Sequence, residues 1–178
     1  MVVQYRRQPP PSRLEVWTDS DFAGCTRTRK STSSASVLYG AHWLRSSSTT
    51  QQVQALSTGE AEFHALVKGC SMALGFEAML RDYGVADVSL QLMCDATAGR
   101  GMAERRGVGR VRHLHTPLLW IQRVVQQQRV RIRKVAGSSN IADMGTKHIE
   151  GPLILKFLEA QGFQIRSGRS RMALRAAI

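Results

Sequence analysis

Patterns of apolar and polar residues divide the chain into alternating extended and helical segments. Five segments have the short apolar or alternating patterns of strands: 14–18, 35–39, 42–44, 88–94 and 129–133. Residues 53–56 form a further short extended piece. The first strand ends on the carboxylate of Asp19 and the fourth ends on Asp95. Loops rich in Ser and Thr join the early strands, which favours an antiparallel meander.

Residues 57–83 carry the longest helical pattern. Ser57 and Glu60 have the spacing of a capping box, in which the hydroxyl and the carboxylate each bind a free backbone N–H. Apolar or small residues recur every three or four positions and predict one buried stripe: Leu66, Gly69, Ala73, Phe76, Leu80 and Tyr83. Gly84 is a typical helix stop. Shorter helices are predicted over 96–103, 117–128 and 153–161, and after the capping residues 138–140.

The order of these elements predicts an α/β fold. Three antiparallel strands precede the long helix, and helices then connect the last two strands. Because helical crossovers join parallel strands, we expect a mixed five-stranded sheet flanked by helices. A chain of 178 residues fits one domain. We place it at 14–150, between a proline-rich leader or linker (1–13) and a C-terminal helix with a basic tail (151–178).

The charge balance favours a polyanionic partner. The chain has a net charge of +12 and an isoelectric point near 10.8, and nucleic acid is the first candidate. A membrane surface is the competing partner, but the sequence offers no amphipathic Lys-rich helix and no membrane-spanning stretch. Three widely spaced cysteines without a C-x-x-C pair, and the lack of an apolar signal sequence, favour a soluble protein in a reducing compartment.

Three acidic residues are predicted to converge at one edge of the sheet. If the strands that end on Asp19 and Asp95 are parallel neighbours, both carboxylates emerge at their shared carboxyl edge. Glu62 lies four residues before Leu66 of the buried stripe and therefore faces the sheet, whereas Glu60 faces elsewhere. Buried acids need a partner, and several together favour a cation. The alternative is that the two aspartates only form turns.

Other polar residues leave a functional and a structural interpretation open. Asp143 follows Asn140 by three residues, so it is either an acid favoured by the helix dipole or a further metal ligand. His113 and His115 lie in a basic loop, where a lone histidine is more often incidental than catalytic; the pair could also bind zinc, but the lack of nearby cysteines disfavours zinc. The arginines of 129–133 form a solvated edge or, given the total charge, contact nucleic acid.

An ordered set of motifs resembles one known family. In chain order the motifs are TDSDFAG (18–24), RKSTS (29–33), LSTGEAEFHAL (56–66), MCD (93–95), RHL (112–114) and NIADMGTK (140–147). Together they closely resemble the ribonuclease H domain at the end of the Pol polyprotein of copia-type LTR retrotransposons. The resemblance implies a ribonuclease H-like fold and an endonuclease that hydrolyses the RNA strand of RNA–DNA hybrids during reverse transcription.

The resemblance also implies roles for individual residues. The acids that would bind two Mg²⁺ ions, with Mn²⁺ as a substitute, are Asp19, Glu62, Asp95 and Asp143. His113 would assist catalysis near the fourth acid. The basic residues that we expect to contact phosphates are Arg27, Arg29, Lys30, Arg105, Arg106, Arg110 and Arg112. The expected partners are the hybrid and a reverse transcriptase domain of the same polyprotein. The expected location is intracellular, in cytoplasmic virus-like particles and also in the nucleus.

Departures from the family pattern leave turnover in question. Gly59 replaces a usual Thr, Ala96 replaces a common Asn, and the segment after His113 and Leu114 lacks the acid, the aromatic residue and the histidine that commonly follow. A catalytically inactive nucleic-acid-binding remnant is therefore the alternative function. A strand-transferring integrase or transposase is a third hypothesis. It fits less well, because the helix with Glu62 directly follows the meander and precedes a separate strand.

Overall fold

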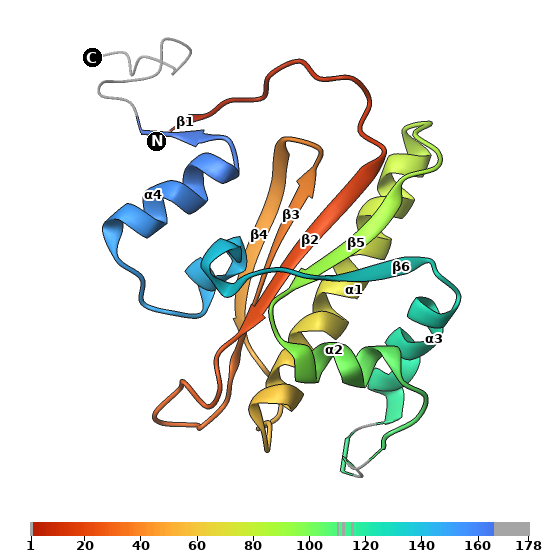
Figure 1. Cartoon of the computed structure of the whole chain (residues 1–178), viewed down its shortest axis with the longest axis vertical. Helices are drawn as coiled ribbons and strands as arrows, with labels where there is room; N and C mark the ends of the chain where they lie inside the picture. The colour runs from red at the N-terminus through yellow and green to blue at the C-terminus, as the bar shows by residue number, and fades with distance from the viewer. Residues whose placement is uncertain (1, 110, 112, 115, 166–178) are drawn as a thin grey trace, which may run out of the picture.

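The core of the molecule is a five-stranded mixed sheet, with strands in the order β4-β3-β2-β5-β6 (Figure 1). The computed structural model describes residues 2–109, 111, 113–114 and 116–165. The strands of the sheet are β2 (Arg13–Ser20), β3 (Thr32–Tyr39), β4 (His42–Thr50), β5 (Ser89–Cys94) and β6 (Val130–Lys134). As predicted, β2, β3 and β4 are antiparallel, whereas β5 is parallel to β2 and β6 is parallel to β5.

Helices cover the two faces of this sheet unequally. On one face α1 (Thr58–Asp82) crosses β2, β3 and β5. On the same face α2 (Thr97–Glu104) packs beside α1, and α3 (Trp120–Gln126) packs against α2 and β6. On the other face lie the 3-10 turn η3 (Ile141–Gly145) and α4 (Gly151–Ala160). The 3-10 turns η1 (Thr116–Leu119) and η2 (Gly137–Ser139) complete the connections. Within the described residues, no helix combines the length and the apolar character needed to cross a membrane.

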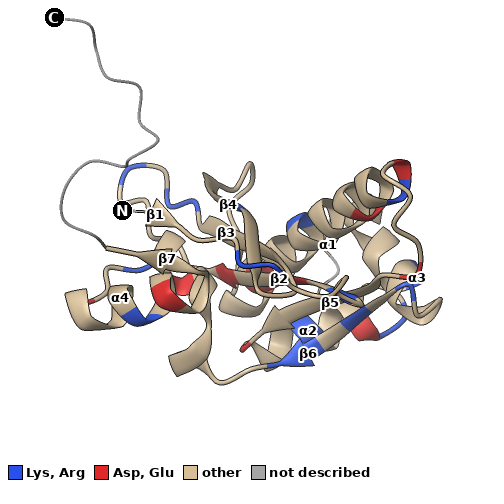
Figure 2. Cartoon of the chain, turned by 90° about the horizontal axis from the view of Figure 1, so that it is seen from above, with Lys and Arg blue, Asp and Glu red and all other residues tan. Residues whose placement is uncertain are grey.

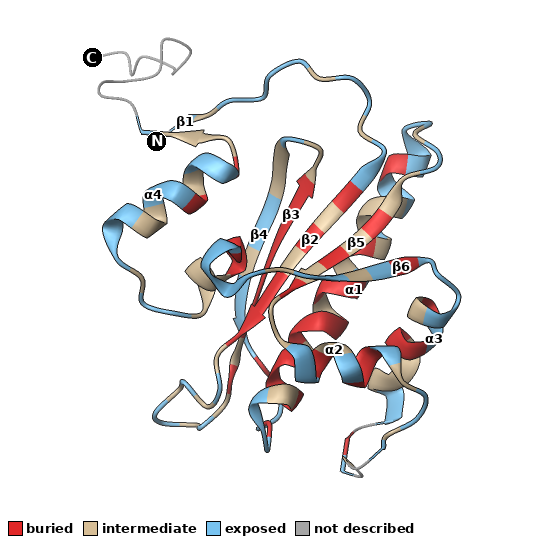
Figure 3. Ribbon diagram, viewed as in Figure 1, coloured by how far each residue is buried: buried red, intermediate tan, exposed pale blue. Residues whose placement is uncertain are grey.

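Strand alternation separates the two faces of β2. Leu14 and Val16 are completely buried in the core formed with α1, and Thr18 continues this face. Trp17 and Asp19 therefore project to the opposite face. The helix approaches the sheet closely at Gly69, where any Cβ atom would clash with Thr18. Figure 3 shows the resulting line of buried residues along α1 and the central strands.

A smaller apolar cluster holds the C-terminal part of the chain on the opposite face. It consists of the buried side chains Leu38, Ile141 and Phe157, from β3, η3 and α4. Beyond α4, β7 (Phe163–Gln164) pairs antiparallel with β1 (Val2–Val3). The N-terminal segment, expected to be a leader or linker, thus lies against the end of α4 (Figure 1).

Several sequence-based element predictions are wrong. Residues 53–56 are an irregular connection into α1 and not an extended piece, and β4 is longer than the predicted 42–44. Tyr83 is 78% exposed because it caps α1 beyond the last turn, where the buried stripe no longer faces the sheet. Gly84 adopts a φ of +77° and ends the helix as predicted.

Candidate metal centre

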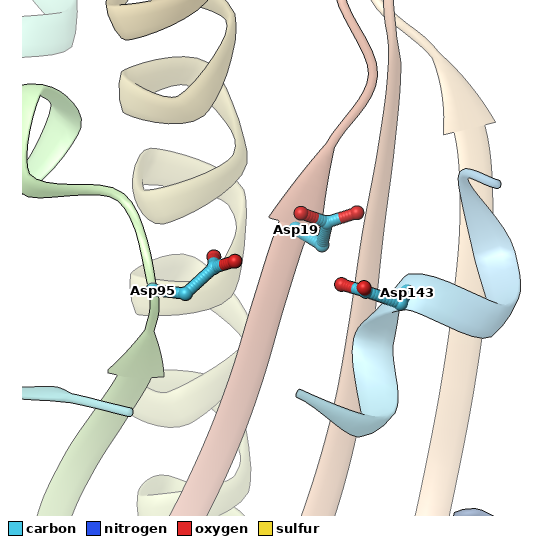
Figure 4. Close-up of side chains that lie close together, drawn as sticks. All are labelled: Asp19, Asp95 and Asp143. Atoms are coloured by element: carbon cyan, nitrogen blue, oxygen red, sulfur yellow. The ribbon is translucent and has the colours of Figure 1, made fainter. Parts of the chain in front are cut away.

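Three elements that are distant in the sequence bring carboxylates to one point (Figure 4). Asp19 lies near the end of β2, Asp95 directly follows β5 and Asp143 lies in η3. One oxygen atom of each lies within 4.8 Å of the others. The parallel pairing of β2 with β5 places the first two at one edge of the sheet, and η3 packs across β2 and β3 to bring in the third.

Asn140 fixes the turn that carries Asp143. Its buried side chain caps η3 by accepting a hydrogen bond from the Ala142 N–H at 3.2 Å. The same amide donates to the Thr18 carbonyl at 3.0 Å and to Asp95 Oδ1 at 3.3 Å. One side chain thus joins η3, β2 and the end of β5. The sequence identified it only as a capping residue, because the other two contacts depend on the tertiary fold.

Glu62 reaches the same centre from the second turn of α1. It is buried, and its burial, together with the charges of Asp19 and Asp95, raises the pKa of its carboxyl to about 8. The start of α2 packs directly against it, since a Cβ atom at Gly99 would lie 2.8 Å from Glu62 Cβ. Glu62 thus lies near enough for the charges of the aspartates to act on its carboxyl, although the group of oxygens within 4.8 Å of one another contains only Asp19, Asp95 and Asp143.

Glu60 has a different set of partners. Its carboxylate accepts a hydrogen bond from the Leu56 N–H at 2.9 Å, one residue earlier than a capping box predicts, and lies 2.9 Å from His113 Nε2. His113 therefore contacts the start of α1, and its assistance to catalysis near Asp143 stays a prediction. The neighbouring Leu114 is buried in the main core and holds this loop against the helix.

Lys147 supplies positive charge to the acidic centre. Its Nζ lies 3.1 Å from Asp143 Oδ2 and 3.4 Å from Asp19 Oδ2. Burial alone would lower the pKa of Lys147, but the charges of these two carboxylates raise it above its usual value. The hydroxyl of Thr146 donates a second hydrogen bond to Asp19. Neither residue was predicted to have a role, although the four-residue step from Asp143 to Lys147 is a signal for such a pair.

The acids suit a divalent cation. Burial and the charge of Asp19 raise the pKa of Asp143 to about 6. Its Oδ1 atom is buried and has no hydrogen-bond partner among the described residues, so a strong acceptor is left for a cation to satisfy. Clustered carboxylate oxygens are hard ligands of the kind that Mg²⁺ and Mn²⁺ prefer. Asp19, Asp95, Asp143 and Glu62 could therefore hold such ions.

The predicted phosphate contacts lie in two loops at the same end of the sheet (Figure 1). Arg27 and Arg29 are exposed and Lys30 is half-buried in the loop between β2 and β3. After α2, Arg106 is exposed, whereas the Arg105 guanidinium donates a hydrogen bond to the Val108 carbonyl. The remaining predicted phosphate contacts, Arg110 and Arg112, lie outside the described residues, as does His115, for which no role was predicted.

The chain is similar in sequence to part of a retrotransposon protein. It is 26% identical over 135 residues to the retrovirus-related Pol polyprotein from transposon TNT 1-94 of Nicotiana tabacum. The match covers 75% of this chain and 10% of the relative, so the chain spans about a tenth of that polyprotein's length. No protein-family model matches the chain.

Solved structures with a similar fold are ribonucleases H. The N-terminal ribonuclease H domain of a Mycobacterium tuberculosis protein gives a TM-score of 0.53 at 15% identity, covering 83% of this chain and 97% of that chain. LC11 ribonuclease H1, isolated from compost, gives 0.52 at 15% identity over 83% and 99% of the two chains. The same enzyme in complex with an RNA/DNA hybrid gives 0.51 at 13% identity over 75% and 94%. The chain thus has a ribonuclease H fold and resembles, as its motifs predicted, the ribonuclease H domain of a retrotransposon Pol polyprotein.

Proposed function

We propose that this chain is a metal-dependent endonuclease that hydrolyses the RNA strand of RNA–DNA hybrids. The observation that carries the proposal is the convergence of Asp19, Asp95 and Asp143 within 4.8 Å, with the buried Glu62 close enough to be affected by their charges. The ribonuclease H fold supports the reaction class, and a protein with this fold has been crystallised with an RNA/DNA hybrid. The similarity to a Pol polyprotein supports a role in reverse transcription of a copia-type retrotransposon.

The four acids would hold two divalent ions, Mg²⁺ or Mn²⁺. When bound, such ions activate a water nucleophile and stabilise the charge on the leaving oxygen. The chain orients its carboxylates through neighbours: Asn140 binds Asp95, and Thr146 and Lys147 bind Asp19. Glu62, with its pKa near 8, must release its proton before it can act as a ligand. Ion binding should therefore release protons at neutral pH.

The expected context follows from the same proposal. Exposed arginines of the β2–β3 loop and of the loop after α2 would bind the phosphates of the hybrid independently of sequence. Contacts to 2′-hydroxyls would select the RNA strand. We expect a reverse transcriptase domain of the same polyprotein as the neighbouring partner, and an intracellular location in virus-like particles or the nucleus.

Cleavage of a labelled hybrid tests the proposal. The purified chain should cut the RNA strand with Mg²⁺ or Mn²⁺, leave the DNA strand intact and be inactive in EDTA. Asp19→Asn should lower the rate by about 100-fold or more, because it removes a charged ligand of the metal ions. It also removes the ion pair of Asp19 with Lys147. Glu104→Gln, an exposed acid on α2, is the matched control and should cut at the wild-type rate.

The same assay distinguishes the alternative function. A chain that binds the hybrid but leaves it uncut with either metal would contradict the nuclease proposal. That result would favour a nucleic-acid-binding remnant, for which the altered sequence after Leu114 is the supporting observation. Joining of labelled duplex DNA, without hybrid cleavage, would instead favour an integrase-like activity.

A further inference from the structure

The basic face of β6 lies on the same side of the sheet as the acidic centre. Val130 is buried in the main core with α1, and Ile132 packs against that core. Arg131 and Arg133 alternate with them and therefore project to the opposite face. Asp19 projects from this opposite face as well. Figure 2 shows these basic positions on β6, at the edge of the sheet.

The register of the sheet places the two arginines in a line that leads to the metal centre. In the parallel pairing of β5 with β6, Arg131 lies beside Gln91 and Arg133 lies beside Met93. Asp95 follows Met93 by two residues, which is about 7 Å along a strand, and neighbouring strands are about 4.8 Å apart. Arg133 thus lies on the neighbouring strand, two residues before the level of Asp95, and Arg131 lies two residues further from Asp95.

This face of β6 is open in the described part of the chain. The helix that contacts β6 is α3, which packs in the main core with α1, and η3 and α4 lie over β2 and β3. Arg131 and Arg133 are exposed, and no carboxylate of the described residues lies within ion-pair distance of either guanidinium. By contrast, Arg129 binds Glu77 of α1 at 3.0 Å.

We propose that Arg131 and Arg133 form a phosphate-binding track that holds the backbone of the nucleic acid next to the bond that is cut. Guanidinium groups bind phosphate oxygens through paired N–H donors, and two of them spaced along a strand suit successive phosphates better than one isolated charge. The track deepens the proposed function and rests on it for the identity of the ligand as an RNA–DNA hybrid. It adds a surface to the two basic loops, on the β6 side of the acids.

Hybrid binding in EDTA, followed by fluorescence anisotropy over a series of KCl concentrations, tests the track. The double variant Arg131→Gln/Arg133→Gln should bind the hybrid more weakly. It should also reduce the slope of log K against log salt by about 1.5, since each lost phosphate contact removes about 0.7 to 0.9. The control Arg81→Gln/Arg123→Gln removes the same charge from α1 and α3, on the far face, and should keep the wild-type slope.

Cleavage kinetics separate this inference from the proposed function. With Mg²⁺, the double variant should raise KM about tenfold and keep kcat, because the carboxylates are unchanged. If the wild type cuts the hybrid and the double variant has the same salt slope and the same KM as the wild type, the track is overturned and the nuclease proposal stands. If the wild type does not cut the hybrid but the double variant binds it with a smaller salt slope than the wild type, the track is supported and the nuclease proposal is refuted. If the double variant is insoluble because the arginines only protect an edge strand, the single variants decide through the same slope.

Discussion

Glu62 links the stability of the metal-free protein to pH. Its pKa is raised from 4.5 to about 8, so the folded state keeps a proton that the unfolded state releases between these values. The contribution of Glu62 is therefore complete below about pH 4.5 and is lost as pH rises through 8. We expect the free energy of unfolding, measured in EDTA with urea, to fall by a few kcal/mol over this range.

Glu62→Gln should flatten that pH dependence, because glutamine mimics the protonated carboxyl and cannot titrate. Asp143, with its pKa near 6, will continue to contribute at the lower end of the range. Glu104→Gln, which removes an exposed acid, should retain the full wild-type slope. Parallel curves for wild type and Glu62→Gln would show that Glu62 ionises normally and that it does not lie in a crowded acidic centre.

The sequence could identify the acids better than their supporting contacts. Helix register placed Glu62 towards the sheet because a four-residue step from Leu66 is a local rule. The contact of Glu60 with His113 follows no such rule, since it joins residues 53 positions apart through a loop that Leu114 anchors. Lys147 combines the two cases: its ion pair with Asp143 is local in sequence and predictable, whereas its ion pair with Asp19 joins distant parts of the sequence and is not.

The elements were predictable where their pattern is long. The helix over 57–83 and the strands that end on acids have enough periodic positions to define their faces, and the parallel crossovers follow from their order. The 3-10 turn η3 is five residues long, too short for a periodic pattern, and the pairing of β1 with β7 joins two-residue strands at opposite ends of the described chain. Such features depend on tertiary contacts, which local propensity does not record.

Phe157 of α4 should stabilise both the fold and the position of Asp143. Its side chain is 1% exposed and packs with Leu38 and with Ile141, two residues before Asp143 in η3. Phe157→Ala should lower the free energy of unfolding by about 3 to 5 kcal/mol because it leaves a cavity. It should also weaken Mn²⁺ binding in calorimetric titrations, since η3 loses the surface against which it packs.

Leu155→Ala is the matched control on the same helix. Leu155 is 44% exposed, so its truncation should change stability by less than about 0.5 kcal/mol and leave Mn²⁺ binding unchanged. If Phe157→Ala destabilised the protein but bound Mn²⁺ as tightly as wild type, α4 would have no part in positioning the acids, and contacts such as those of Asn140 and Ser48 would hold η3.

For the molecule as a whole, the acidic centre is a local exception in a strongly basic protein. A net charge of +12 repels cations at long range, so a divalent ion will bind only where carboxylates concentrate. The grouping of Asp19, Asp95 and Asp143 leaves mutual repulsion that Lys147 offsets in part and that a divalent ion would relieve. A ligand that binds the folded state alone raises its stability, by about 2.7 kcal/mol at 100 times its Kd.

Thermal unfolding should therefore show a rise in Tm with Mg²⁺ or Mn²⁺. For a protein of this size, the rise should be about 2 to 4 °C for each kcal/mol of binding. KCl at matched ionic strength should give a smaller change, because it screens charges without coordinating them.

Asp95→Asn keeps the hydrogen bond from Asn140 but removes one repelling charge, so its metal-free Tm should equal or exceed that of the wild type. The variant should also lose the metal-induced rise. An equal rise in Asp95→Asn would place the ion elsewhere on the protein and would remove the physical basis for grouping these acids as one metal centre.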